Sequence, residues 1–136
     1  MNEDTSGSKM AMVIDDNNID LYITARVIRK ISGIGQVLEF SSGESALQYL
    51  KDAKSDLSLV PEYIFVDIYM PEMSGFEFME AYDFLPEELK KHCKCYIVSS
   101  SIDEKDINRA HADKNVIAFQ EKPVPLSFFE RVINSL

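Results

Sequence analysis

Residues 63–75 read YIFVDIYMPEMSG, and the fold can be worked out from this stretch. Tyr63–Ile68 predicts a short strand that is apolar on both faces, as in a buried parallel sheet. An aspartate, Asp67, lies at the end of this strand. Pro71 and Gly75 interrupt the chain before the next predicted helix, so the strand gives way to a loop directly after its aspartate.

The same alternation of strand and helix extends in both directions. Strands are predicted at Met10–Ile14, Gln36–Phe40, Tyr63–Ile68, Lys94–Val98 and Val116–Phe119. Helices are predicted from Asn17 or Asn18 to about Ile31, from Ser42-Gly43 through Ala53, and from Ser74, Asp103 and Pro125 onward. Pro86 predicts a kink or restart in the third helix.

This order of elements predicts an α/β fold, because strands that alternate with helices form a parallel sheet covered on both faces. We expect a doubly wound, flavodoxin-like sheet of five parallel strands in the order 2-1-3-4-5. Ligands of such folds bind at the carboxyl ends of the strands where the order reverses, here between the first and third strands. Residues 1–8 are expected to form a flexible tail and residues 9–136 one domain.

Two helices carry apolar stripes that predict their buried faces. In the first helix the stripe is Ile19, Tyr22, Ile23, Val27 and Ile31. In the last helix it is Leu126, Phe129, Ile133 and Leu136.

The composition narrows the class of protein. The chain has 23 acidic and 14 basic residues and a formal net charge of -9, which disfavours direct nucleic-acid binding. No apolar run approaches a membrane span and the N-terminus is polar, so we expect a cytoplasmic protein without membrane contact. Cys93 and Cys95 lack companion ligands for a metal and are expected to be reduced thiols.

Five polar side chains follow strands at one predicted edge of the sheet. Asp15 and Asp16 follow the first strand, Asp67 the third, Ser99 the fourth, and Lys122 the fifth. Clustered carboxylates raise one another's pKa unless a cation is present, and an all-oxygen site suits Mg²⁺. A magnesium ion, a lysine and a hydroxyl can each take one phosphoryl oxygen, and an aspartate can serve as the nucleophile.

The segments VIDDN (13–17), FVDIYMPEMSG (65–75), IVSSS (97–101) and EKP (121–123) together resemble the response-regulator receiver domain of two-component signalling. The resemblance runs from Lys9 to Leu136 and is to the stand-alone, chemotaxis-regulator-like single-domain type. It implies that Asp67 accepts a phosphoryl group from a histidine kinase or histidine phosphotransfer protein. It also implies a Mg²⁺ ion held by Asp15, Asp16, Asp67 and the backbone carbonyl of Tyr69.

The resemblance also assigns the residues of a switch. Ser99 would be the switch hydroxyl, Lys122 the partner of the phosphoryl oxygens, and Phe119 the switch aromatic. The Lys122–Pro123 peptide bond would be cis, an isomer that X–Pro bonds adopt at small cost. The modulators of phosphate lifetime would be Tyr69, Ser100 and Ser101. Whether bulky Tyr69 shields the phosphoryl group or only packs on its loop is left open by the sequence.

Phosphorylation is expected to shift a two-state equilibrium at the face formed by the fourth helix, fifth strand and fifth helix. This face comprises 103–112, 116–119 and 126–136. Because the chain stops after the fifth helix, we expect output through a separate protein or a phosphate relay. The chain is expected to be a monomer or a phosphorylation-dependent dimer, with no enzyme activity beyond self-catalysed phosphoryl transfer and autodephosphorylation.

Other classes fit less well. A haloacid-dehalogenase-type phosphatase would need a second acid where this chain has Asn17. A calcium loop starting at Asp15 fails at Ile19 and lacks the central glycine. No P-loop or dinucleotide glycine pattern is present. A receiver that no longer takes phosphate is a further alternative, disfavoured by the complete set of five site residues.

Overall fold

The computed structural model describes residues 9–134, so the predicted tail and the predicted inward position of Leu136 lie outside the described residues. Within this range a single sheet contains five strands, all paired in parallel, in the order β3-β2-β4-β5-β6. The strands are β2 (Lys9–Ile14), β3 (Ile34–Phe40), β4 (Tyr63–Val66), β5 (Lys94–Ser99) and β6 (Val116–Glu121). This arrangement confirms the predicted order 2-1-3-4-5.

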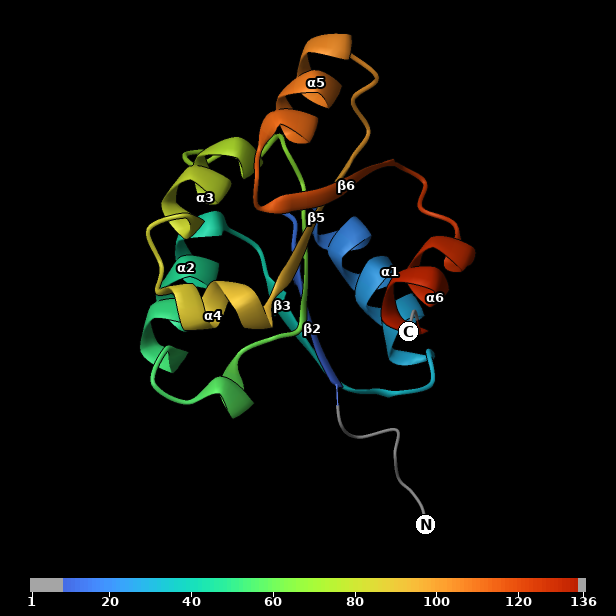
Figure 1. Ribbon diagram of the computed structural model, residues 1–136. Helices are drawn as coiled ribbons and strands as arrows, with labels where there is room; N and C mark the ends of the chain where they lie inside the picture. The colour runs from blue at the N-terminus through green and yellow to red at the C-terminus, as the bar shows by residue number, and fades with distance from the viewer. Residues whose placement is uncertain (1–8, 135–136) are drawn as a thin grey trace.

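Helices cover both faces of the sheet (Figure 1). One face carries α1 (Asn18–Arg29) and α6 (Leu126–Asn134), and the other carries α2 (Gly43–Ala53), α3 (Gly75–Tyr82) and α4 (Glu87–His92). The helix α5 (Glu104–Ala112) stands at the top of Figure 1 beside β6, and a short 3₁₀ turn spans Leu57–Leu59. Two apolar cores result, one on each face of the sheet.

Local sequence explains where the helices begin. Asn17, one of the two predicted caps of this helix, accepts hydrogen bonds with its side chain from backbone N–H groups in the first turn of α1. Ser74 and Glu77 form a reciprocal capping box at the start of α3. Pro86 lies between α3 and α4, so the predicted restart after it is confirmed.

The predicted buried stripe of α1 is wrong in its first half. Ile19 is 70% exposed, and Tyr22 and Ile23 are also exposed, while the sheet covers Leu21 and its neighbours at helical spacing. The helix has two apolar stripes, and the sheet can cover only one of them. An apolar face of α1 therefore stays at the surface. In α6, Leu126 is likewise exposed rather than buried.

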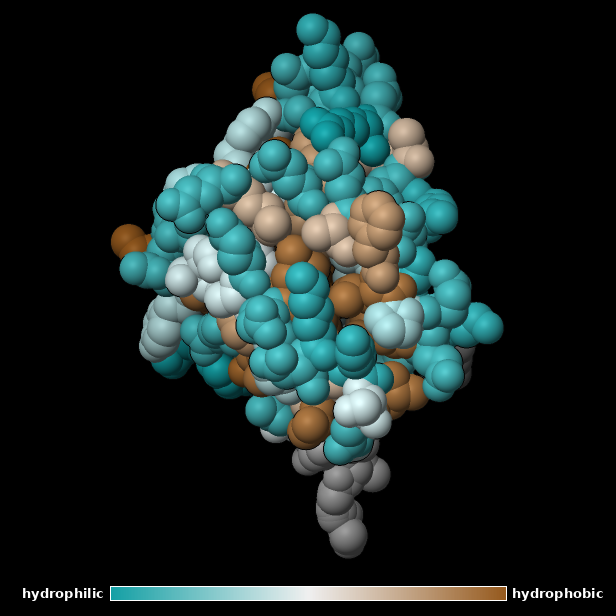
Figure 2. Space-filling view, turned by 90° about the vertical axis from the view of Figure 1, so that its left-hand side faces the viewer, coloured by the Kyte–Doolittle hydropathy of each residue, from teal (hydrophilic) through white to brown (hydrophobic). Residues whose placement is uncertain are grey.

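Hydrophilic residues dominate the surface over α2, α3 and α4, with smaller apolar areas between them (Figure 2). Across residues 9–134, no helix combines the length and the apolar character that crossing a bilayer requires. Both cysteines are free and buried, and burial raises the pKa of Cys93 to about 12. They are therefore poor nucleophiles at neutral pH.

Candidate functional site

The sheet brings three carboxylates together at the carboxyl ends of β2 and β4. These strands are neighbours with Ile14 paired to Val66, so the next residues of each chain segment lie side by side. One carboxylate oxygen from each of Asp15, Asp16 and Asp67 lies within 4.8 Å of the other two. The first and last of these are buried and Asp16 is exposed. An oxygen-only donor set with one side open to water fits a hard divalent cation such as Mg²⁺.

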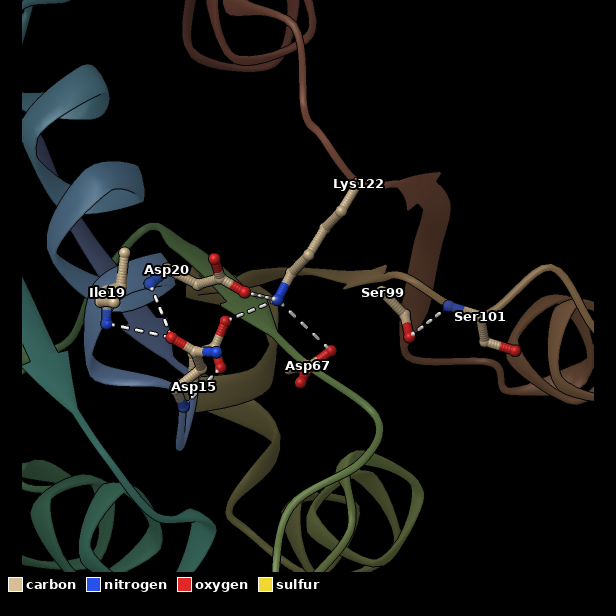
Figure 3. A network of polar contacts seen from close by, with 8 residues as sticks. Asp15, Ile19, Asp20, Asp67, Ser99, Ser101 and Lys122 are labelled. Atoms are coloured by element: carbon tan, nitrogen blue, oxygen red, sulfur yellow. Dashed lines mark hydrogen bonds and ion pairs between the residues drawn. The ribbon is translucent and has the colours of Figure 1, made fainter.

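Lys122 reaches the same cluster from the loop after β6 (Figure 3). Its Nζ lies 2.7 Å from Asp15 Oδ2, 3.1 Å from Asp20 Oδ2 and 3.7 Å from Asp67 Oδ1. The contact with Asp20 was not expected from the sequence. Asp20 lies in the first turn of α1, where an acidic residue commonly serves only the helix dipole.

The electrostatics of the cluster follow from burial and crowding. Burial raises the pKa of Asp67 from 3.8 to about 6, and the charges of Asp15 and Asp16 add to this, while Lys122 acts in the opposite direction. Burial alone would lower the pKa of Lys122, but its hydrogen bond to Asp15 and the charge of Asp67 raise it. The lysine therefore stays charged among carboxylates that lack enough positive charge.

Ser99 lies on the other side of Asp67 (Figure 3). Its side chain is buried, and its Oγ accepts a hydrogen bond of 3.2 Å from the backbone N–H of Ser101. The hydroxyl of Ser101 donates to Asp106 Oδ2 at 2.7 Å, and the hydroxyl of Tyr69 donates to the same oxygen. Asp106, in the first turn of α5, thus joins the loop after β4 to the loop after β5. The sequence pattern did not indicate this role.

Gly75 explains the spacing of the loop that follows Asp67. A Cβ atom at this position would lie 2.2 Å from the backbone oxygen of Asp67, which is far inside van der Waals contact. The Gly75 N–H also donates to the Ile68 carbonyl at 2.7 Å. Helix α3 can begin this close to the strand end only with glycine there, so Gly75 sets the position of the Asp67 backbone.

The remaining predicted residues surround this centre. Phe119 is half-buried and packs against the core beneath α2, α3 and α4. The Lys122–Pro123 peptide bond is cis. Ser100 is exposed and lines a hollow together with Lys122. The metal-binding role of the Tyr69 backbone carbonyl stays a prediction.

Comparison with known proteins places this geometry in a family. The family described as the response regulator receiver domain matches residues 11–133. The chain belongs to this family. A receiver structure from Dyadobacter fermentans is 27% identical, with a TM-score of 0.82 and coverage of 93% of this chain and 95% of that one. A two-component response regulator from Cytophaga hutchinsonii has a TM-score of 0.84 at 24% identity, covering 93% and 94%.

Receiver domains within longer proteins are also similar. Histidine kinase CKI1 of Arabidopsis thaliana is 30% identical over 101 residues, and Histidine kinase 3 of the same plant is 32% identical over 83 residues. These alignments cover 69% and 61% of this chain. The chain spans only 8% and 7% of the length of these curated relatives, so the likeness concerns the receiver domain alone.

Proposed function

We propose that this receiver domain accepts a phosphoryl group on Asp67 from a phosphohistidine of a histidine kinase or a histidine phosphotransfer protein. The observation that carries the proposal is the position of the Asp67 carboxylate, 8% exposed, between two other aspartates and the Lys122 ammonium group. Raising the pKa of a carboxylate makes it a better nucleophile, and a nearby cation offsets the charge of an incoming phosphoryl group.

The transfer needs no cofactor beyond a divalent cation. An Asp67 oxygen attacks phosphorus, the bond between phosphorus and the histidine nitrogen breaks, and its electron pair stays on the imidazole, which takes a proton from solvent. Asp15, Asp16, Asp67 and the Tyr69 backbone carbonyl would hold Mg²⁺, which supplies charge neutralisation when bound. Lys122 binds a phosphoryl oxygen. Water later attacks the acyl phosphate, so the domain loses its phosphoryl group by self-catalysed hydrolysis. We propose no enzyme activity beyond this transfer and hydrolysis.

The labelling experiment tests this directly. Wild-type protein incubated with Mg²⁺ and acetyl phosphate should gain the mass of one phosphoryl group, and Asp67→Asn should gain none. Labelling of Asp67→Asn to the same stoichiometry would refute Asp67 as the acceptor. It would also favour the alternative of a receiver used only as a fixed binding module.

We further propose that the protein donor docks over the exposed apolar face of α1. A hollow of about 400 Å³ lined by Ile23, Thr24 and Lys122 joins this face to the site. The Lys122 ammonium group in this hollow is 3.7 Å from Asp67. Ile23→Asp should slow transfer from a phosphorylated protein donor and leave labelling by acetyl phosphate unchanged, since the small donor needs no docking. Leu59→Asp, at an exposed leucine in the short 3₁₀ turn, is the matched control.

For output, we propose a single-domain response regulator that acts on a separate partner through α5, β6 and α6. Phosphate would draw Ser99 inward and let Phe119 rotate into the space it leaves. The kinase relatives favour the alternative of a phosphate relay. A pulldown of partner proteins with and without beryllofluoride separates these outcomes. Size-exclusion chromatography under the same two conditions tests for a phosphorylation-dependent dimer. A cytoplasmic location stays a prediction.

A further inference from the structure

Within residues 9–134, Asp20 is the one ion-pair partner of Lys122 that the proposed chemistry does not use. Its Oδ2 lies 3.1 Å from the Lys122 Nζ, closer than the 3.7 Å to Asp67. Asp20 comes from the first turn of α1, while the other two partners of the lysine end strands. Asp20 therefore holds the lysine on the α1 side of the site from an element separate from the two strands.

Asp20 also lies outside the group of carboxylates that can hold a cation. That group consists of Asp15, Asp16 and Asp67 in the described part of the chain. A cation bound by these three engages Asp15 and weakens its pull on Lys122, because the carboxylate then shares its charge with the ion. Asp20 keeps its full charge. It is then the main carboxylate competitor for the lysine.

The pair has room to separate. The Lys122 side chain is 16% exposed and that of Asp20 is 40% exposed. Both line the open hollow beside α1, so the lysine can leave Asp20 without displacing packed side chains. When the Lys122 ammonium group lies close to Asp20, its attraction to a phosphoryl oxygen on Asp67 is weaker, because the attraction between charges falls with distance.

We infer that Asp20 is a positioning residue that competes with the phosphoryl group on Asp67 for the Lys122 ammonium group and thereby weakens the phosphorylated state. The inference rests on the proposed function of Asp67. It assigns to the first turn of α1 a brake on phosphoryl binding that is separate from metal binding.

The experiment measures beryllofluoride affinity in Mg²⁺ by titration of backbone amide NMR signals. Asp20→Asn should bind about fivefold more tightly than wild type, the size expected for a half-exposed ion pair. Asp20→Glu keeps the charge and should bind like wild type. Glu44→Gln is the matched control, because it removes one exposed acid from the first turn of α2 without a lysine contact at the site. It should change affinity by less than twofold.

A second measurement reports on Lys122 without any phosphoryl mimic. An amine-reactive ester should acylate Lys122 at least about twice as fast in Asp20→Asn as in wild type, by mass spectrometry, since one of its ion pairs is gone. If Asp20→Asn matches Glu44→Gln in both measurements, the inference is wrong while Asp67 remains the acceptor. If wild-type protein does not bind beryllofluoride at all, the proposed function itself fails.

Discussion

Charged groups lie on one side of Asp67, and hydroxyl groups lie on the other. On the α1 side the Lys122 ammonium group is 16% exposed and ion-paired with carboxylates, one of which, Asp15, has a side chain only 4% exposed. On the α5 side, Asp106 receives its hydrogen bonds from Tyr69 and a serine near the surface. Asp67 thus faces a buried ionic cluster in one direction, and in the other the buried Ser99 hydroxyl and the hydroxyl groups that surround the Asp106 carboxylate.

This difference separates chemistry from readout. Buried ion pairs are difficult to rearrange, because a charge left without its partner is costly in a medium of low dielectric constant. Exposed hydrogen bonds contribute only about 1 kcal/mol each and exchange readily with water. We therefore expect the α1 side to decide whether a phosphoryl group is held, and the α5 side to pass that state on to α5.

Removing the positive charge of Lys122 should have the largest effect. Lys122→Met leaves buried Asp15 and Asp67 facing each other without a positive charge. The free energy of unfolding should fall by about 3 kcal/mol in urea titrations with a chelator present. Lys114→Met is the control, because Lys114 is 75% exposed in its ion pair with Asp83 and should cost under about 1 kcal/mol. Equal losses in the two variants would mean that charge does not hold the α1 side.

Removing the acid should have the opposite sign. The pKa of Asp67 is raised from 3.8 to about 6, so the folded state binds this proton more tightly than the unfolded chain does. The contribution of Asp67 to the free energy of unfolding is favourable below about pH 4 and is lost as the pH rises through about 6. Metal-free Asp67→Asn should therefore be more stable than wild type by about 2 kcal/mol at about pH 8, and by little at about pH 4.

Urea titrations at both pH values check this prediction. Magnesium should shrink the difference at about pH 8, because the ion binds and stabilises only the wild-type acidic cluster strongly. A variant less stable than wild type at about pH 8 without metal would show that the Lys122 contact outweighs burial at Asp67.

The charge-held side was largely predictable from the sequence. Asp15 and Asp67 each follow a short apolar strand, and the handedness of the crossovers makes those two strands neighbours. The topology alone therefore brings their carboxylates together. Lys122 follows β6, the edge strand of the same sheet. Gly75 fixes the distance between the end of β4 and the start of α3.

The residues that sequence reasoning missed share a different origin. Asp20 and Asp106 lie in first turns of helices, where an acid stabilises the helix N-terminus whether or not it touches anything else. Their contacts depend on how each helix is rotated over the sheet. The same rotation of α1 buries Leu21 and exposes Ile19, which the apolar pattern did not distinguish. Helix rotation, rather than topology, was the missing information.

The smallest expected effect lies on the hydroxyl side and decides what Tyr69 does. If its ring shields the phosphoryl group, Tyr69→Ala should shorten the lifetime of the acyl phosphate by about threefold, measured as loss of label in Mg²⁺ buffer. Tyr69→Phe keeps the ring and loses only the bond to Asp106, so about twofold is expected. Asp106→Ala also removes this bond, together with the one from Ser101, so adding Tyr69→Phe to Asp106→Ala should bring no further change. Glu104→Ala, also in the first turn of α5, should leave the lifetime unchanged. An unaltered lifetime in Tyr69→Ala would leave this side chain a packing role only, and the α5 side would then carry the readout without affecting the chemistry.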